Sequence, residues 1–107
     1  MIEVNESDWK LFRARLPEWQ SAYMDRLNQE YIAILTGPGR PSEKFWALEK
    51  RISKDQRHTG VIADMRRSVM YQNLLSLLNE GAITLADLDG FSEDLRERMA
   101  FMVKMYS

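Results

Sequence analysis

The chain has 107 residues, a formal net charge of −1 and no cysteine, so it can form neither a disulfide nor a cysteine-ligated metal site. With 45% hydrophobic and 29% charged residues it has the composition of a globular protein, and its length predicts a single helical domain over residues 1–107. The acidic first ten residues lack the pattern of a signal peptide, and no apolar run approaches the roughly 18 residues of a membrane span. We therefore expect a cytoplasmic protein that does not enter a membrane.

The first third of the sequence predicts either two helices or one kinked helix. Ser7 is placed to cap a helix over residues 8–16, and Pro17 suits the first turn of a second helix that runs to about Leu35. At the junction the chain either bends or runs on with a kink. The apolar residues recur at helical spacing and form one stripe: Trp19, Tyr23, Leu27, Tyr31 and Ile34.

The middle of the sequence predicts two more helices. The glycines and prolines of residues 36–41 end the preceding helix, and Ser42 is then expected to cap a helix over residues 43–56. Its inward residues are predicted to be Phe45, Leu48 and Ile52. A joint near residues 57–60 leads to a fourth, strongly apolar helix over residues 61–79, with Gly81 just beyond its C-terminal cap.

The acidic stretch "ITLADLDGFSEDL", residues 83–95, resembles a calcium loop only in its composition. In no register do its carboxylates and Gly90 fall at the positions that an EF-hand requires. The stretch instead predicts two successive helix starts. Thr84 caps a short helix and pairs with Asp87, Gly90 ends that helix, and Ser92 caps a final helix from Glu93 to about Tyr106.

No alternating strand pattern of useful length interrupts these helical segments. The predicted fold is therefore all-α, a single compact bundle of four main helices plus a short helix before the C-terminal one. The residues expected in its core are Trp19, Tyr23, Leu27, Phe45, Leu48, Ile52, Met65, Val69, Leu74, Leu77, Leu88 and Met99.

The sequence contains no assembled set of catalytic or ligand-binding residues. His58 is the only histidine, no serine lies in a nucleophile elbow, and "GPGRP" lacks the features of a phosphate-binding loop. We predict no catalytic, cofactor-binding or metal-binding residues, no cofactor, and a protein that is not an enzyme.

The basic segment over residues 40–67 is the first candidate interaction surface. Residues 37–68 hold eight lysines and arginines against four acids, whereas both flanking segments are acidic. Such a patch can neutralise nucleic-acid phosphates, and the residues that would contact an anion or nucleic acid are Lys50, Lys54, Arg57, Arg66 and Arg67. The interspersed acids favour instead a solvated surface with internal ion pairs, such as Lys50 with Asp55 or Asp64 with Arg67. Nucleic-acid binding is thus the alternative function.

The C-terminal helix is the second candidate interaction surface, because its apolar residues occur on more than one side. A helix of this kind must be covered on more than one side. The residues expected to meet a partner are Phe101, Met102, Met105 and Tyr106. The partner is an unknown protein or a second copy of the chain, since small domains often complete their cores by self-association. The preferred function is a non-enzymatic protein–protein interaction or regulatory module.

Three segments, residues 8–35, residues 41–52 and residues 83–95, resemble in the same order a group of short, uncharacterised all-helical bacterial proteins. Some members of that group are labelled multidrug transporters. The absence of a membrane span in this sequence argues against such a label here. The resemblance implies a compact bacterial domain and supplies no catalytic residues.

Overall fold

The computed structural model describes residues 3–106, and every regular element in that range is helical. The elements in chain order are α1 (Glu6–Thr36), α2 (Pro41–Asp55), the 3₁₀ turn η1 (Arg67–Val69), α3 (Met70–Asn79), the 3₁₀ turn η2 (Leu85–Leu88) and α4 (Glu93–Tyr106). The predicted all-α class, with four main helices and a short helix before the last, is confirmed.

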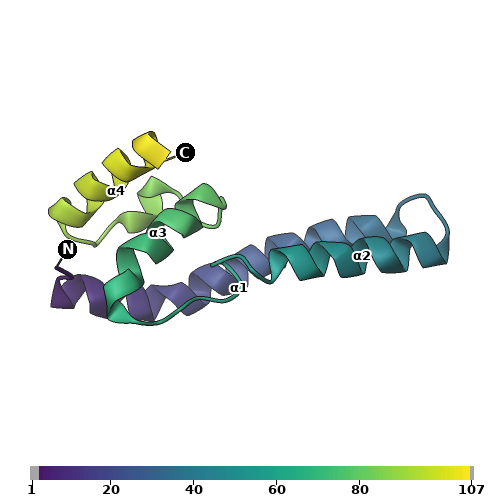
Figure 1. The fold of residues 1–107 in the computed structure, drawn as a ribbon, viewed down its shortest axis with the longest axis horizontal. Coiled ribbons are helices and arrows are strands. Elements are labelled where there is room, and N and C mark those ends of the chain that lie inside the picture. The colour runs from purple at the N-terminus through teal and green to yellow at the C-terminus, as the bar shows by residue number, and fades with distance from the viewer. Residues whose placement is uncertain (1–2, 107) are drawn as a thin grey trace.

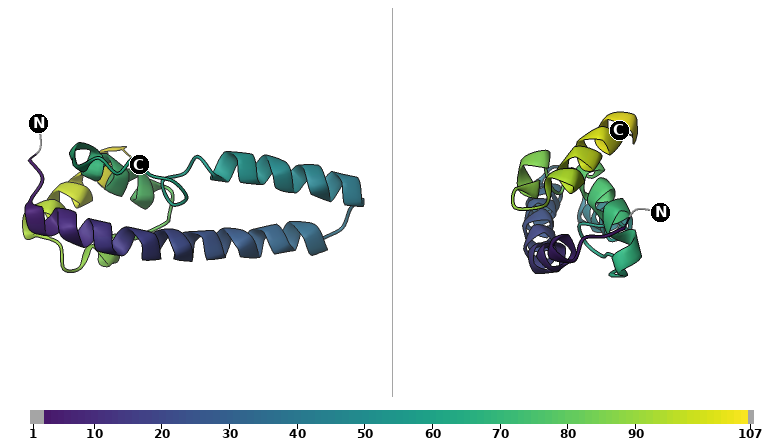
Figure 2. Two further views of the ribbon diagram at one scale, coloured as in Figure 1. Left: turned by 90° about the horizontal axis from the view of Figure 1, so that it is seen from below. Right: turned by 90° about the vertical axis from the view of Figure 1, so that its left-hand side faces the viewer.

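The long helix α1 organises the molecule, which measures 51 × 25 × 22 Å. Its C-terminal half pairs with the antiparallel α2 to form a hairpin, while η1, α3, η2 and α4 gather around its N-terminal half as a head (Figure 1). Figure 2 shows from two further sides that the hairpin extends away from the head and is not covered by it. The radius of gyration is 16.3 Å, compared with about 13 Å for a spherical chain of this length. The hairpin accounts for this elongation.

The start of α1 differs from the prediction, because Asn5 and not Ser7 is the N-cap. The Asn5 side chain accepts hydrogen bonds from the backbone N–H groups of Ser7, at 2.7 Å, and Asp8, at 3.4 Å. Of the two expectations for Pro17, the continuous helix is correct, since α1 runs through this residue. The missing N–H is tolerated because Phe12 and Leu16, on the turns just before the proline, are buried in the head.

The start and packing of α2 also differ from the prediction. Arg40 precedes the helix and makes no side-chain cap, so Ser42 is not the cap, and Pro41 occupies the first helical position, where its fixed φ is favourable. The core predictions for Phe45 and Ile52 are wrong, since these side chains are 62% and 42% exposed. Because α2 packs mainly against α1, only a narrow stripe of it is covered, and Leu48 is half-buried.

The helix predicted over residues 61–79 begins only at Met70. The side chain of Asp64 accepts a hydrogen bond from the backbone N–H of Arg66 at 3.0 Å, a local turn that competes with helix formation. Residues 62–66 consequently have no regular structure, and the prediction that Met65 is buried is wrong, since it is 44% exposed. Val69, in η1, is half-buried.

The hydrophobic core lies in the head. Predicted core residues that are buried comprise Tyr23, Leu27, Leu74, Leu77, Leu88 and Met99, and Trp19 packs partly buried against the cluster. The cluster itself joins α1, α3, η2 and α4 through Phe12, Leu16, Met70, Tyr71, Leu74, Leu77, Ile83, Leu88, Phe91, Leu95 and Met99. No apolar side chain of α2 belongs to it, because the only buried residue of α2 is Asp55.

The predicted helix ends in the C-terminal third are confirmed. Gly81, with φ of 76°, follows the C-cap of α3, and the backbone N–H groups of Gly81 and Ala82 donate to the carbonyls of Leu78 and Leu77, as in a Schellman motif. The Asp87 carboxylate accepts from the Thr84 backbone N–H at 2.7 Å. Gly90, with φ of 93°, ends this turn, and the Ser92 hydroxyl accepts from the Leu95 N–H at 3.2 Å.

Asp8 fastens the start of α4 to the start of α1. Its side chain is 2% exposed and accepts hydrogen bonds from the Ser92 backbone N–H at 2.8 Å and from the Ser92 hydroxyl at 2.6 Å. The same hydroxyl caps α4 by accepting from Leu95. A carboxylate in the first turn of α1 therefore orients the cap of a helix 84 residues away in sequence.

We predict that Asp8→Ala lowers the free energy of unfolding by about 1–3 kcal/mol, because it leaves two partly buried donors of Ser92 without their partner. Asp8→Asn should cost about half as much, since its amide retains one acceptor oxygen. Urea unfolding followed by circular dichroism measures both values. The control is the exposed Asp25→Ala, expected to change stability by less than about 0.5 kcal/mol. Equal stability of the Asp8→Ala variant and the wild type would contradict this role.

Candidate functional site

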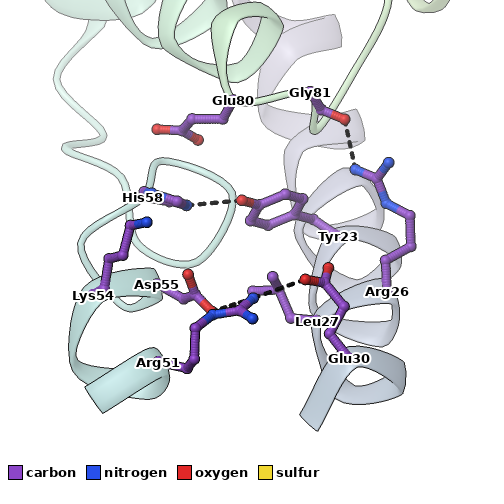
Figure 3. Close-up of a pocket in the computed structure, with 10 residues that line it drawn as sticks. All are labelled: Tyr23, Arg26, Leu27, Glu30, Arg51, Lys54, Asp55, His58, Glu80 and Gly81. Atoms are coloured by element: carbon purple, nitrogen blue, oxygen red, sulfur yellow. Dashed lines mark hydrogen bonds and ion pairs between the residues drawn. The ribbon is translucent and has the colours of Figure 1, made fainter. Parts of the chain in front are cut away.

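A polar cavity of about 460 Å³ lies where the hairpin meets the head. We call it the junction cavity (Figure 3). Its walls come from α1, the end of α2, the following loop and the end of α3, and the residues that line it are Tyr23, Arg26, Leu27, Glu30, Arg51, Lys54, Asp55, His58, Glu80 and Gly81. It is the place where charged and titratable side chains from both parts of the molecule face one another.

An ion-pair network crosses the hairpin side of the cavity. The Arg51 guanidinium lies 2.8 Å from the Glu30 carboxylate and 3.4 Å from that of Asp55. The buried Asp55 also accepts a hydrogen bond from the Tyr31 hydroxyl at 2.7 Å. Burial and the Asp55 hydrogen bond raise the pKa of Tyr31 to about 12. The network joins α1 to α2 and supplies hydrogen-bond and ion-pair partners to Asp55, the only buried residue of α2.

The loop after α2 is held against both α1 and α3. His58 Nδ1 shares a 2.7 Å hydrogen bond with the Tyr23 hydroxyl. The Glu80 carboxylate accepts from the backbone N–H groups of Thr59, at 2.9 Å, and Gly60, at 3.0 Å. Gly60 lies directly on the Tyr23 ring, where a Cβ atom would be 2.8 Å from Cγ of the ring. The absence of a side chain at Gly60 therefore permits the loop to close.

The junction cavity has the character of a structural joint. Its lining contains three acids and three permanent cations, and Arg26 also donates to the Gly81 carbonyl at 2.6 Å. No serine or cysteine lines it. Within residues 3–106 no buried side-chain nitrogen or oxygen lacks a hydrogen-bond partner, and no three His, Cys, Asp or Glu side chains converge as a metal site would require. The polar groups of the cavity are largely engaged with one another.

The five predicted basic residues occupy different parts of the molecule. Lys50 and Lys54 lie on α2, with Lys54 at the junction cavity, and Arg57 is exposed in the loop beyond it. Arg66 pairs with Asp64, and Arg67 pairs with Glu6 and donates to the Val4 carbonyl at 2.8 Å.

The lysines of α2 and Arg67 lie near different ends of α1. Lys54 shares a cavity with Arg26, whereas Arg67 reaches the first turn of α1 at Glu6. Twenty helical residues correspond to about 30 Å, so Arg67 is remote from the α2 lysines. The ion pairs that form also differ from those expected: Arg51 and not Lys50 pairs with Asp55, and Arg66 and not Arg67 pairs with Asp64.

The predicted partner surface on α4 is largely open. Phe101, Met105 and Tyr106 are between 61% and 66% exposed, whereas Met102 packs partly buried against the core. A groove of about 490 Å³ runs along this helix, lined by Asp94, Glu97, Arg98, Phe101, Met102 and Tyr106. An ion pair of 2.9 Å between Arg98 and Asp94 borders its apolar floor.

Sequence reasoning missed a second exposed apolar surface, on one side of the hairpin. A shallow groove of about 290 Å³ is lined there by Met24, Leu27, Asn28, Tyr31, Ile52, Asp55, Gln56 and Val61. Helical spacing extends this side to Leu35 on α1 and to Leu48 and Phe45 on α2. We call Met24, Tyr31, Leu35, Phe45, Leu48 and Ile52 the apolar face. The spacing of these residues was visible in the sequence, but it indicated a core, because periodicity does not reveal whether a neighbouring layer exists.

Comparison of the chain with protein-family models, with curated proteins and with solved structures gave no match. In the part of the chain that the structure describes, no helix combines the length and the apolar character needed to cross a membrane. The geometry of the site is thus the basis for a functional proposal.

The contact between Gly60 and Tyr23 predicts a strong energetic coupling. Gly60→Ala should lower the free energy of unfolding by about 1–3 kcal/mol, because its methyl group overlaps the Tyr23 ring. In a Tyr23→Leu background, which removes the ring, the same change should cost less than about 0.5 kcal/mol. Urea unfolding of the wild type, the two single variants and the double variant gives the coupling free energy between positions 60 and 23. An equal cost in both backgrounds would show that the ring does not restrict this position.

The raised pKa of Tyr31 predicts a pH dependence of stability. Since its pKa rises from about 10 in the unfolded chain to about 12 in the folded protein, its contribution is complete below about pH 10 and is lost as the pH approaches 12. Tyr31→Phe should therefore lose less stability than the wild type between about pH 9 and pH 11. Urea unfolding at the two pH values measures the difference. Identical losses would rule out the contribution of Tyr31.

Proposed function

We propose that this protein is a non-enzymatic protein–protein interaction or regulatory module that works in the bacterial cytoplasm. The observation that carries the proposal is the exposure of its large hydrophobic side chains. Among residues 3–106 twelve of them are exposed and thirteen hydrophobic residues are buried. Scattered single apolar residues are normal on a protein surface, but contiguous patches are typical of binding sites.

The exposed side chains gather where a partner could cover them. One group lies on α4 and includes Phe101, Met105 and Tyr106. The other lies on the hairpin and includes Phe45 and Ile52. Aromatic and methionine side chains are enriched at the centres of interfaces, where their removal from water contributes most to affinity. Both groups have this composition, which supports an interaction role for the two surfaces.

The alternative, a nucleic-acid-associated protein, has weaker support. Arg66 and Arg67 are engaged with Asp64 and Glu6, and Arg67 is remote from the α2 lysines. Phosphate binding needs several cations along one surface. The remaining group of Lys50, Lys54 and Arg57 is small and lies beside the acids of the hairpin.

Site-specific photo-crosslinking in cells that naturally contain the protein tests the proposed function. A photoreactive phenylalanine analogue at Phe45 or Phe101 should give a covalent adduct with a polypeptide, because these exposed rings would be buried in the complex. The analogue at the exposed Glu18 is the control and should give at least about tenfold less adduct. Adduct levels at both aromatic positions no higher than at Glu18 would contradict the proposal.

A further inference from the structure

The helix α2 contains large apolar residues that the other described residues of the chain leave largely exposed. It carries Phe45, Trp46, Leu48 and Ile52, yet its only buried residue is the acid Asp55. An isolated helix of 15 residues is marginally stable in water, and helices in proteins are stabilised mainly by burial of an apolar stripe. In this chain α2 obtains little of that burial from α1, so a further layer would add the missing stabilisation.

The two sides of the hairpin differ in their chemistry. The side that faces the junction cavity carries the charged residues Arg26, Glu30, Arg51 and Lys54. The opposite side is the apolar face, and the other exposed residues that line its groove are the neutral Asn28 and Gln56. Glu49, four positions after Phe45 and three before Ile52, is the one exposed charged residue that helical spacing places beside them. The Asp55 carboxylate lies at the edge of the groove, where it accepts a hydrogen bond from Tyr31 and forms an ion pair with Arg51. A face with a single carboxylate and no cation offers little to a polyanion or to a strongly charged protein, and favours an occupant that is largely apolar itself.

We propose, on the basis of the function proposed above, that the occupant of the apolar face is the same face of a second copy of this chain. Two antiparallel hairpins stacked face to face give a four-helix bundle, which is the common way of burying two-helix layers. A two-fold interface requires a surface that complements itself. A face with six apolar residues and one carboxylate, that of Glu49, meets this requirement with little like-charge repulsion, and the net charge of −1 per chain opposes pairing only weakly.

The area of the face fits a weak dimer. The 15 residues of α2 extend about 22 Å, and two packed helices are about 20 Å wide, so each copy contributes about 450 Å² in flat projection. The two copies together would therefore bury about 900 Å² in flat projection. The uneven surface of the side chains makes the true buried area larger than this projection. Stable interfaces bury about 1,200–2,000 Å², and smaller ones are transient. We therefore expect a dissociation constant on the order of 1–100 μM.

Sedimentation equilibrium of the pure protein from about 5 to 500 μM tests the inference. The wild type should pass from monomer to dimer over this range. Phe45→Glu combined with Ile52→Glu should raise the dissociation constant at least about tenfold, because it places like charges within the buried face.

Lys50→Glu is the matched control, because it changes the net charge by the same amount as the double change. Lys50 is exposed and lies two positions from Ile52, on the opposite side of α2 from the apolar face. Trp46 is unsuitable, since its ring packs edge-on against that of Phe45 with the centroids 5.0 Å apart. The dissociation constant of the Lys50→Glu variant should stay within about threefold of that of the wild type. A wild type that is monomeric at every concentration would overturn the inference. So would a dimer that Lys50→Glu weakens as much as the double change, or one that only Phe101→Glu weakens.

Photo-crosslinking of the pure protein keeps the test independent of any folding defect in the charged variants. The photoreactive analogue at Phe45 should yield covalent dimer, whereas the analogue at Lys50, on the opposite side of α2, should yield little. Absence of dimer from Phe45 would overturn the inference. A cellular adduct of Phe45 with a different protein, together with a monomeric pure protein, would overturn the dimer while the interaction function remained supported.

Discussion

The continuity of α1 is the constraint on which the rest of the structure depends. Its 31 residues run unbroken through Pro17, so one rigid rod supports the head at one end and α2 at the other. The N-terminal half is covered by α3, η2 and α4 and contributes Phe12 and Leu16 to the core. The C-terminal half is covered by α2 and, at Tyr23 and Arg26, by the loop after α2 and the end of α3. A bend at Pro17 would have allowed the second half to fold back onto the head and bury the apolar face.

Two clamps of polar groups fix the head and the hairpin on this rod. Asp8 holds the N-cap of α4 through Ser92, and Glu80 holds the loop after α2 through its backbone N–H groups. Each clamp uses a carboxylate that accepts two hydrogen bonds, which are stronger than those between neutral groups. The charged residues of the junction cavity therefore determine how the hairpin is placed. They leave its opposite, mainly apolar side free for association.

Local sequence signals were sufficient where a residue acts on its immediate neighbours. The pairing of Thr84 with Asp87, the cap at Ser92 and the helix ends at Gly81 and Gly90 all depend on nearby residues, and all were predicted correctly. The start of α3 was not predicted, because the turn at Asp64 competes with a helix whose apolar pattern looked continuous. The caps Asn5 and Arg40 were missed because several polar residues near each start were compatible with the same pattern.

The sequence by itself determined the helical class, the number of main helices, the C-terminal caps and part of the head core, namely Leu74, Leu77, Leu88 and Met99, because helical period and capping chemistry are local properties. Only the tertiary structure decided that the apolar residues Phe45 and Ile52 have no layer above them. It also decided which polar side chains form hydrogen bonds with each other, since Tyr23 with His58 and Asp8 with Ser92 are 35 and 84 positions apart. Periodicity indicates which side of a helix is apolar, but only the path of the chain determines whether another element reaches that side.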